Sequence, residues 1–140
     1  MYQNETKPCE AGWDIEAMLF DVLKEIGVPA SLLGSKYMIF AIEKAISNPV
    51  PDRKLTRPGG LYDVTAKTFG TTINAVERNI RHAIEVAWDR GDMDTLQRYF
   101  GCTVSSLRGR PTNVEFIYTI ANMIRIELKK NGIPITEEES

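Results

Sequence analysis

Residues 61–91, LYDVTAKTFGTTINAVERNIRHAIEVAWDRG, decide the fold of this chain. The second half of the stretch repeats apolar residues at the i, i+4, i+7 and i+8 spacing of a helix with one buried face. These apolar residues are Val76, Ile80, Ala83, Ile84, Ala87 and Trp88. The first half has the pattern of a shorter helix, so the stretch predicts two helices joined by a short turn.

The turn between these helices has the residue spacing of a helix-turn-helix motif. Ala66 is small enough to let two helices approach, and Gly70 can adopt the left-handed conformation that ends the first helix. Val76 then returns to the shared core. Three polar residues are candidates to cap the second helix: Thr71, Thr72 and Asn74. Asn74, three residues before Glu77, also resembles the start of a capping box.

The face of the second helix opposite the apolar stripe is polar and rich in arginine. It carries Arg78, Arg81, His82, Glu85 and Asp89, and Glu77 lies beside it in the first turn. Arginine can chelate the two acceptors of guanine, and a carboxylate can accept from the cytosine amino group. The pattern therefore indicates a helix that reads DNA bases. The alternative is a solvated face with ion pairs at i, i+4 spacing, such as Arg81 to Glu85.

Charge is unevenly distributed along a chain of ordinary globular composition. The 140 residues suit one domain, with 43% apolar residues, 26% charged residues and a net charge of −2. Residues 1–29 hold two basic and six acidic side chains, whereas residues 53–82 hold six basic and two acidic ones. This local basic excess is compatible with binding phosphates.

Several classes of function have no support in the sequence. Cys9 and Cys102 match no metal or redox spacing, and His82 with Glu85 and Asp89 lacks further ligands, so we expect no metal and no cofactor. No nucleophile motif, glycine-rich phosphate loop or acid–base constellation predicts an enzyme. Because we find neither a signal peptide nor a membrane span, we expect a cytoplasmic protein without membrane contact.

Four more helices are predicted around the central pair, which makes the fold class all-α with six helices. They cover residues 14–26, about 33–47, 93–100 after a cap at Asp92, and 113 to about 130. We expect a flexible arm at 1–12, the helical domain at 13–131 and a disordered acidic tail at 132–140. The proline-rich loop 48–60 contains Arg53, Lys54 and Arg57, which fit either a phosphate contact or a solvated loop.

Residues 76–105, VERNIRHAIEVAWDRGDMDTLQRYFGCTVS, and 110–117, RPTNVEFI, resemble the C-terminal effector domain of the stage-zero sporulation response regulator. That family contains the master transcription factor of endospore-forming bacteria. The similarity continues through LYDVTAKTFGTT at 61–72 and, more loosely, through 23–47. It implies a six-helix DNA-binding domain with one helix-turn-helix. The second helix of that motif would enter the major groove of a box resembling TGTCGAA. The resemblance also implies that two domains bind adjacent boxes as a head-to-tail dimer.

The resemblance implies a role for individual residues at matching positions. Glu77, Arg78 and Arg81 would read bases. Phosphate contacts would come from Thr71, Thr72, His82 and Arg110. Residues 92–100 would contact a sigma subunit of RNA polymerase.

The chain also departs from the family. Ala75 stands where the best-known member has a basic residue, and loop 48–60 has a different composition. In the family a phosphorylated receiver domain precedes the effector domain, whereas here about a dozen residues precede the first predicted helix. The sequence therefore fits either a natural receiver-less protein or a fragment.

Three functions follow from these patterns, and we expect the first. It is a sequence-specific transcription regulator that binds double-stranded DNA. The second is a receiver-less paralogue that acts as an interaction module on a sigma factor or a full-length relative. The third is a non-specific DNA binder, which would show salt dependence without sequence preference.

Overall fold

The computed structural model describes residues 14–48, 55–101 and 109–133, which form six α-helices and no strand. The helices are α1 (Ile15–Ile26), α2 (Leu33–Ser47), α3 (Leu61–Phe69), α4 (Ile73–Arg90), α5 (Met93–Phe100) and α6 (Asn113–Lys130). The all-α prediction and its six helices are confirmed. The predicted arm at 1–12, most of the predicted tail, both cysteines and Arg53 and Lys54 lie outside the described residues.

Local capping explains where three of the helices begin. The Asp14 carboxylate accepts a hydrogen bond from Ala17 N at 3.2 Å, and that of Asp92 accepts one from Thr95 N at 3.0 Å. At α6, Thr112 accepts from Glu115 N while the Glu115 carboxylate accepts from Thr112 N, which completes a capping box. Each cap satisfies N–H groups that the first turn leaves without a helical partner.

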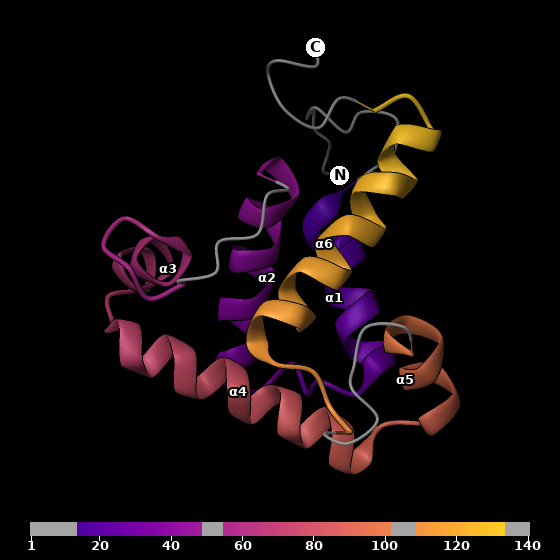
Figure 1. The fold of residues 1–140 in the computed structure, drawn as a ribbon, viewed down its shortest axis with the longest axis horizontal. Helices are drawn as coiled ribbons and strands as arrows, with labels where there is room; N and C mark the ends of the chain where they lie inside the picture. The colour runs from indigo at the N-terminus through magenta and orange to yellow at the C-terminus, as the bar shows by residue number, and fades with distance from the viewer. Residues whose placement is uncertain (1–13, 49–54, 102–108, 134–140) are drawn as a thin grey trace, which may run out of the picture.

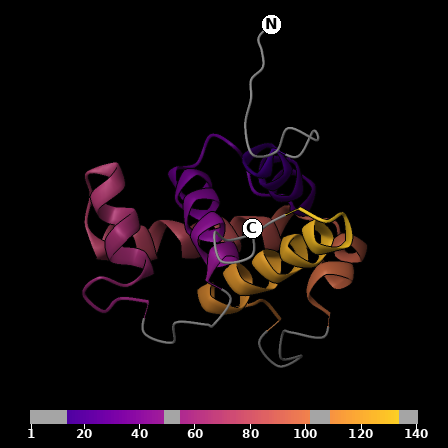
Figure 2. The same cartoon turned by 90° about the horizontal axis from the view of Figure 1, so that it is seen from above.

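Helix α2 is central, and α4 lies along one edge of the domain. α2 packs against α1, α3, α4 and α6, while α5 packs against α1 and α6. Figure 1 shows α4 along the lower edge, with α3 above its N-terminal end and α5 beyond its C-terminal end. Figure 2, seen from above, shows α3 at one end of the domain and α2 crossing over α4, with α6 to one side of α4. One long side of α4 is therefore free of other helices.

The core consists of aliphatic and aromatic side chains at the predicted helical spacing. The α6 stripe is at most 3% exposed throughout; it comprises Phe116, Ile117, Ile120, Ala121, Ile124 and Leu128. The predicted stripe of α4 is buried from Val76 to Ala87, and Trp88 is half-buried against the rings of Phe100 and Phe116. Trp88 thus joins α4 to α5 and α6. No helix in the described ranges combines the length and apolar character needed to cross a membrane.

The backbones of α2 and α4 approach each other closely at Gly34. A Cβ atom on Gly34 would lie 2.2 Å from the carbonyl oxygen of Asn79 and 2.9 Å from the Cβ of Ala83. Neither contacted atom can rotate away, because the Asn79 oxygen belongs to the backbone and the Ala83 Cβ is bonded directly to it. The absence of a side chain at Gly34 therefore sets the distance between α2 and the middle of α4.

We expect Gly34→Ala to lower the free energy of unfolding by about 1–3 kcal/mol, as overpacking in a core does. The loss would occur although alanine favours an isolated helix over glycine by about 1 kcal/mol. Chemical denaturation followed by circular dichroism measures the difference. Lys36→Ala, at an exposed position of the same helix, is the control and should stay within about 0.5 kcal/mol of wild type. A wild-type midpoint for Gly34→Ala would contradict the close approach.

Candidate nucleic-acid interface

Helices α3 and α4 form the predicted helix-turn-helix. Gly70 ends α3 with a φ of 68°, in the left-handed region, and Thr71 N donates to Ala66 O at 2.9 Å. Ala66 is 3% exposed and Val76 is fully buried. The small residue, the glycine and the aliphatic residue therefore have the positions that their spacing predicted.

The cap of α4 is Thr72, and the predicted capping box of Asn74 with Glu77 is wrong. The Thr72 hydroxyl accepts from Ala75 N at 3.1 Å, with the Thr72 backbone in an extended conformation. A capping residue needs non-helical backbone angles, whereas Asn74 already lies in the first turn of the helix. Because Gly70 ends α3 and α4 begins at Ile73, only Thr71 and Thr72 lie between them, so the cap falls on Thr72 and not on Asn74.

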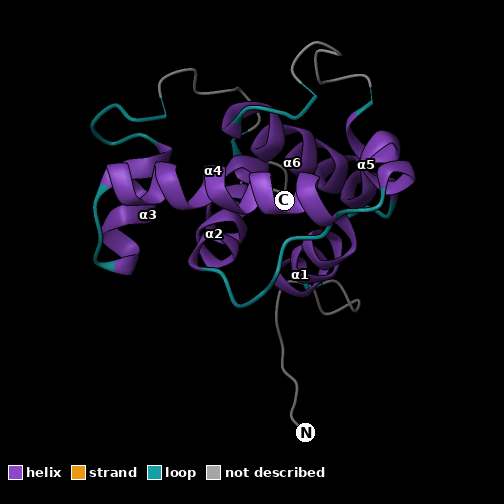
Figure 3. Ribbon diagram, turned by 90° about the horizontal axis from the view of Figure 1, so that it is seen from below, coloured by secondary structure: helices purple, strands orange, loops and turns teal. Residues whose placement is uncertain are grey.

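The uncovered side of α4 presents Arg78 and His82 to solvent. Both are exposed, four residues apart, and therefore project from one face of the helix. Asp89 continues this face towards the C-terminal end, and Asn74 begins it. Figure 3, seen from below, shows α4 crossing in front of the domain with no helix over this side.

Glu77 and Arg81 lie at the edge of this face that borders α6, and they form an ion pair. The i, i+4 partner of Arg81 is therefore the preceding acid, Glu77, and not Glu85; the alternative of a solvated, ion-paired face included both acids. Glu85 instead pairs with Arg110, whose Nη2 lies 3.4 Å from Glu85 Oε2. Glu77, Arg81 and Glu85 thus form an acid–base–acid row along α4, and Arg110 reaches its end from the segment before α6.

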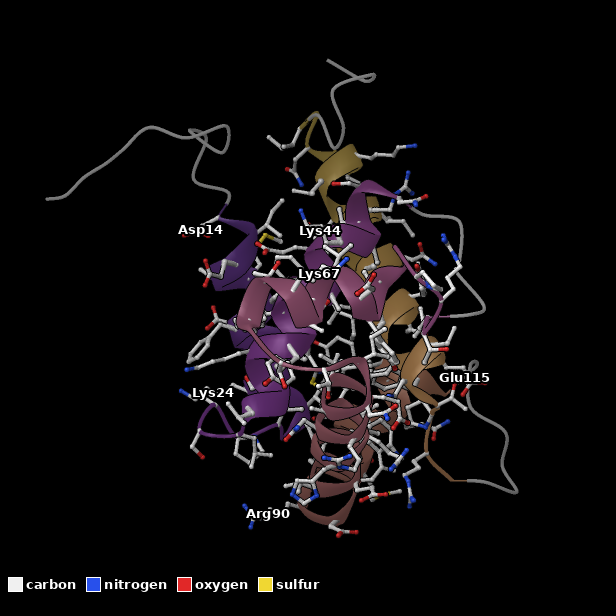
Figure 4. All side chains as sticks on the ribbon, turned by 90° about the vertical axis from the view of Figure 1, so that its left-hand side faces the viewer. Asp14, Lys24, Lys44, Lys67, Arg90 and Glu115 are labelled. Carbon is white, nitrogen blue, oxygen red and sulfur yellow. The ribbon has the colours of Figure 1, made fainter. Side chains whose placement is uncertain are left out.

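A cleft of about 470 Å³ separates this row from the N-terminal end of α6. Its charged lining residues are Glu77, Arg81 and Arg110; Tyr62, Ile84 and residues 111–114 complete it. Figure 4 looks along α4 from its N-terminal end and shows Glu115, which is in the first turn of α6, to one side of α4. The fold therefore brings a predicted phosphate-binding residue, Arg110, beside two predicted base-reading residues.

Asn113 holds α6 against both helices of the motif. Its Nδ2 donates to the Tyr62 hydroxyl at 2.7 Å and to the main-chain oxygen of Glu77 at 3.2 Å. Burial raises the pKa of Tyr62 to about 12, since a buried site disfavours the phenolate. Asn113 and Tyr62 are 51 residues apart and were not among the predicted site residues. Their only sequence signal was the match of residues 61–72 and 110–117 to the family.

The remaining predicted residues lie elsewhere on the domain. Thr71 and Thr72 are at the N-terminal end of α4, where the Thr72 hydroxyl already serves as the cap. Arg57 is exposed beside Lys44 and Asn48 at the end of α2, in a hollow that no residue of α4 lines. Within the three described segments, no group of three or more His, Cys, Asp or Glu residues is arranged to hold a metal ion.

The domain has six helices and a central helix-turn-helix, and the second helix of this motif keeps an arginine-bearing face uncovered. These features are those of a helix-turn-helix DNA-binding domain. Comparison with protein families narrows this class. The family model described as the sporulation initiation factor Spo0A C terminal matches residues 19–124. The chain therefore belongs to this family of DNA-binding sporulation effector domains, which are transcription regulators.

We expect Asn113→Ala to lower the free energy of unfolding by about 1–3 kcal/mol, since two hydrogen bonds of about 0.5–1.5 kcal/mol each are lost. Thermal or urea unfolding measures it, with Asn122→Ala on the exposed side of α6 as the matched control. In a Tyr62→Phe background, Asn113→Ala should cost less, because one of its two acceptors is already gone. Equal costs in both backgrounds would show that the Asn113–Tyr62 bond contributes nothing.

Proposed function

We propose that this domain is a sequence-specific transcription regulator that inserts α4 into the major groove of double-stranded DNA. The main support for this function is the uncovered face of α4 with Arg78 at its centre, in a chain that belongs to a DNA-binding effector family. The other long helices bury their apolar faces together, whereas this side of α4 has no protein partner among the described helices. A helix exposed along one side in this way can enter a groove about 12 Å wide.

Glu77, Arg78 and Arg81 are the proposed base-reading residues. Arg78 is exposed on the outer face and can chelate the two guanine acceptors. Glu77 and Arg81 are paired with each other, which restricts the rotamers of both side chains before DNA arrives. An acid and an arginine side by side suit a cytosine next to a guanine, and TGTCGAA contains such a step.

Phosphate contacts are proposed on the two flanks of α4. Arg110 and the cleft beside it lie on the α6 side, and the turn with Thr71 and Thr72 lies at the N-terminal end of the helix. His82 lies one turn beyond Arg78 on the outer face. Backbone N–H groups at a helix N-terminus also attract phosphate, because the helix dipole is positive there.

Two domains are proposed to bind tandem boxes head to tail. A single domain offers one reading helix and a small contact area, so we expect weak binding to one box. Two adjacent sites raise the effective concentration of the second domain and hence the affinity for a tandem site.

We expect at least a tenfold preference for a duplex with two tandem TGTCGAA boxes over a scrambled duplex, a difference of about 1.4 kcal/mol. Arg78→Ala should remove most of this preference, because one bidentate base contact contributes about 1–3 kcal/mol of discrimination. Fluorescence anisotropy of labelled duplexes at near-physiological salt measures both.

The matched control is Lys129→Ala, which removes one positive charge from the exposed last turn of α6. Figure 1 shows that end of α6 far from α4, so the control should keep the box preference. Equal binding of both duplexes by wild type, with a strong dependence on salt, would replace the proposal with a non-specific DNA binder.

A second candidate function rests on α5. Met93 is 67% exposed at the start of this helix, while Leu96 and Phe100 are buried on its inner side. Methionine is over-represented at promiscuous binding surfaces, because its flexible thioether adapts to different partners. We propose the sigma subunit of RNA polymerase, or a full-length relative, as the partner of α5. Failure of the domain to bind either duplex would make this interaction its main function.

A further inference from the structure

We propose that Glu85 gates Arg110, so that a DNA phosphate competes with a carboxylate of the protein for this arginine. This inference rests on the proposed DNA-binding function and deepens it. It assigns a role to a residue that neither base reading nor phosphate binding uses. The main support is the ion pair between Glu85 and Arg110, which joins α4 to the segment before α6; Arg110 Nη2 lies 3.4 Å from Glu85 Oε2.

The geometry places Glu85 where it competes with DNA. Arg110 Nη2 and Glu85 Oε2 are 3.4 Å apart, and their side chains are 48% and 38% exposed. Both groups are thus open to a ligand that approaches the cleft. A phosphate that bonded to the same guanidinium would come close to the Glu85 carboxylate, and like charges at such short range repel.

The position of Glu85 on α4 strengthens this competition. It follows Arg81 by four residues and Glu77 by eight, so all three carry their charges along one row beside the cleft. Glu77 is already paired with Arg81. Arg110 is the positive charge that Glu85 reaches across the gap between α4 and α6, and neutralising Glu85 therefore leaves Arg110 more available to phosphate.

The alternative role for Glu85 is to orient Arg110 towards DNA, which predicts the opposite sign. An orienting residue improves binding, and its removal weakens it. A gating residue opposes binding, and its removal strengthens it. The direction of the change in affinity therefore distinguishes the two roles without any structure of a complex.

The test is the affinity of Glu85→Gln for the tandem-box duplex and for its scrambled counterpart, measured by anisotropy at about 50 mM and about 200 mM salt. Glutamine keeps the shape of the side chain and removes its charge. We expect Glu85→Gln to bind both duplexes about two- to fivefold more tightly at the lower salt, the range that an exposed ion pair can contribute. The gain should shrink at the higher salt, because ions screen exposed charges.

Two further variants separate the gate from a general charge effect. Asp89→Asn removes the same charge one turn further along the exposed face of α4, and it should tighten binding less than Glu85→Gln. In an Arg110→Ala background, Glu85→Gln should have no more effect than Asp89→Asn, because the gate acts through that arginine and only the general charge effect remains. This double-mutant cycle isolates the pair.

Three outcomes would overturn the inference. They are weaker binding by Glu85→Gln, an equal gain from Asp89→Asn, and an undiminished gain in the Arg110→Ala background. The proposed function fails in a different way, since wild type would then bind neither duplex or would not distinguish them. Box preference in wild type that is lost in Arg78→Ala, together with any of the three outcomes, would reject only the gate.

Discussion

The contact between the backbones of α2 and α4 at Gly34 is the constraint on which the functional surface depends. Because no side chain separates Gly34 from Asn79 O, α2 and α4 approach so closely that even a methyl group at Gly34 would clash with the backbone of α4. The buried stripe from Val76 to Ala87 fixes the rotation of α4 about its axis, since it faces the core along about three turns. Together they determine that Arg78 faces outward and that Arg81 faces the cleft.

The ion pairs of this surface are weak enough to be exchanged. Exposed pairs contribute about 0.2–1 kcal/mol each, because water already solvates both partners. Glu77, Arg81, Glu85 and Arg110 therefore restrict one another in the free domain without a large barrier to release. A surface of this kind also has less net positive charge than its arginines suggest. In the proposed complex, affinity for DNA would then depend more on base contacts and less on the phosphate charge that every sequence shares.

The sequence predicted those features that neighbouring residues determine. Helical periodicity located all six helices, Asp92 marked the beginning of α5 through its cap, and Gly70 marked the end of α3 through a left-handed turn. Thr72 was one of three predicted capping candidates for α4, and only the capping box at Asn74 was wrong. The choice was open locally, because two threonines and an asparagine all suit the role chemically. The pairing of Arg81 with Glu77 instead of Glu85 was equally undecided, since both lie four residues away.

Contacts between distant residues could not be predicted in the same way. The Asn113–Tyr62 bond and the Glu85–Arg110 pair connect residues 51 and 25 positions apart, and periodicity carries no information on which helix faces which. The same holds for Glu25, whose carboxylate accepts from Tyr99 at 2.7 Å and pairs with Arg98 at 2.7 Å. Gly91, between α4 and α5, adds a second contact with α1, because a Cβ there would lie 2.6 Å from Ile26 O. These contacts tie α5 to α1 and to the end of α4. A partner on α5 and a duplex on α4 would therefore be held at a fixed spacing by packing, and not across a hinge.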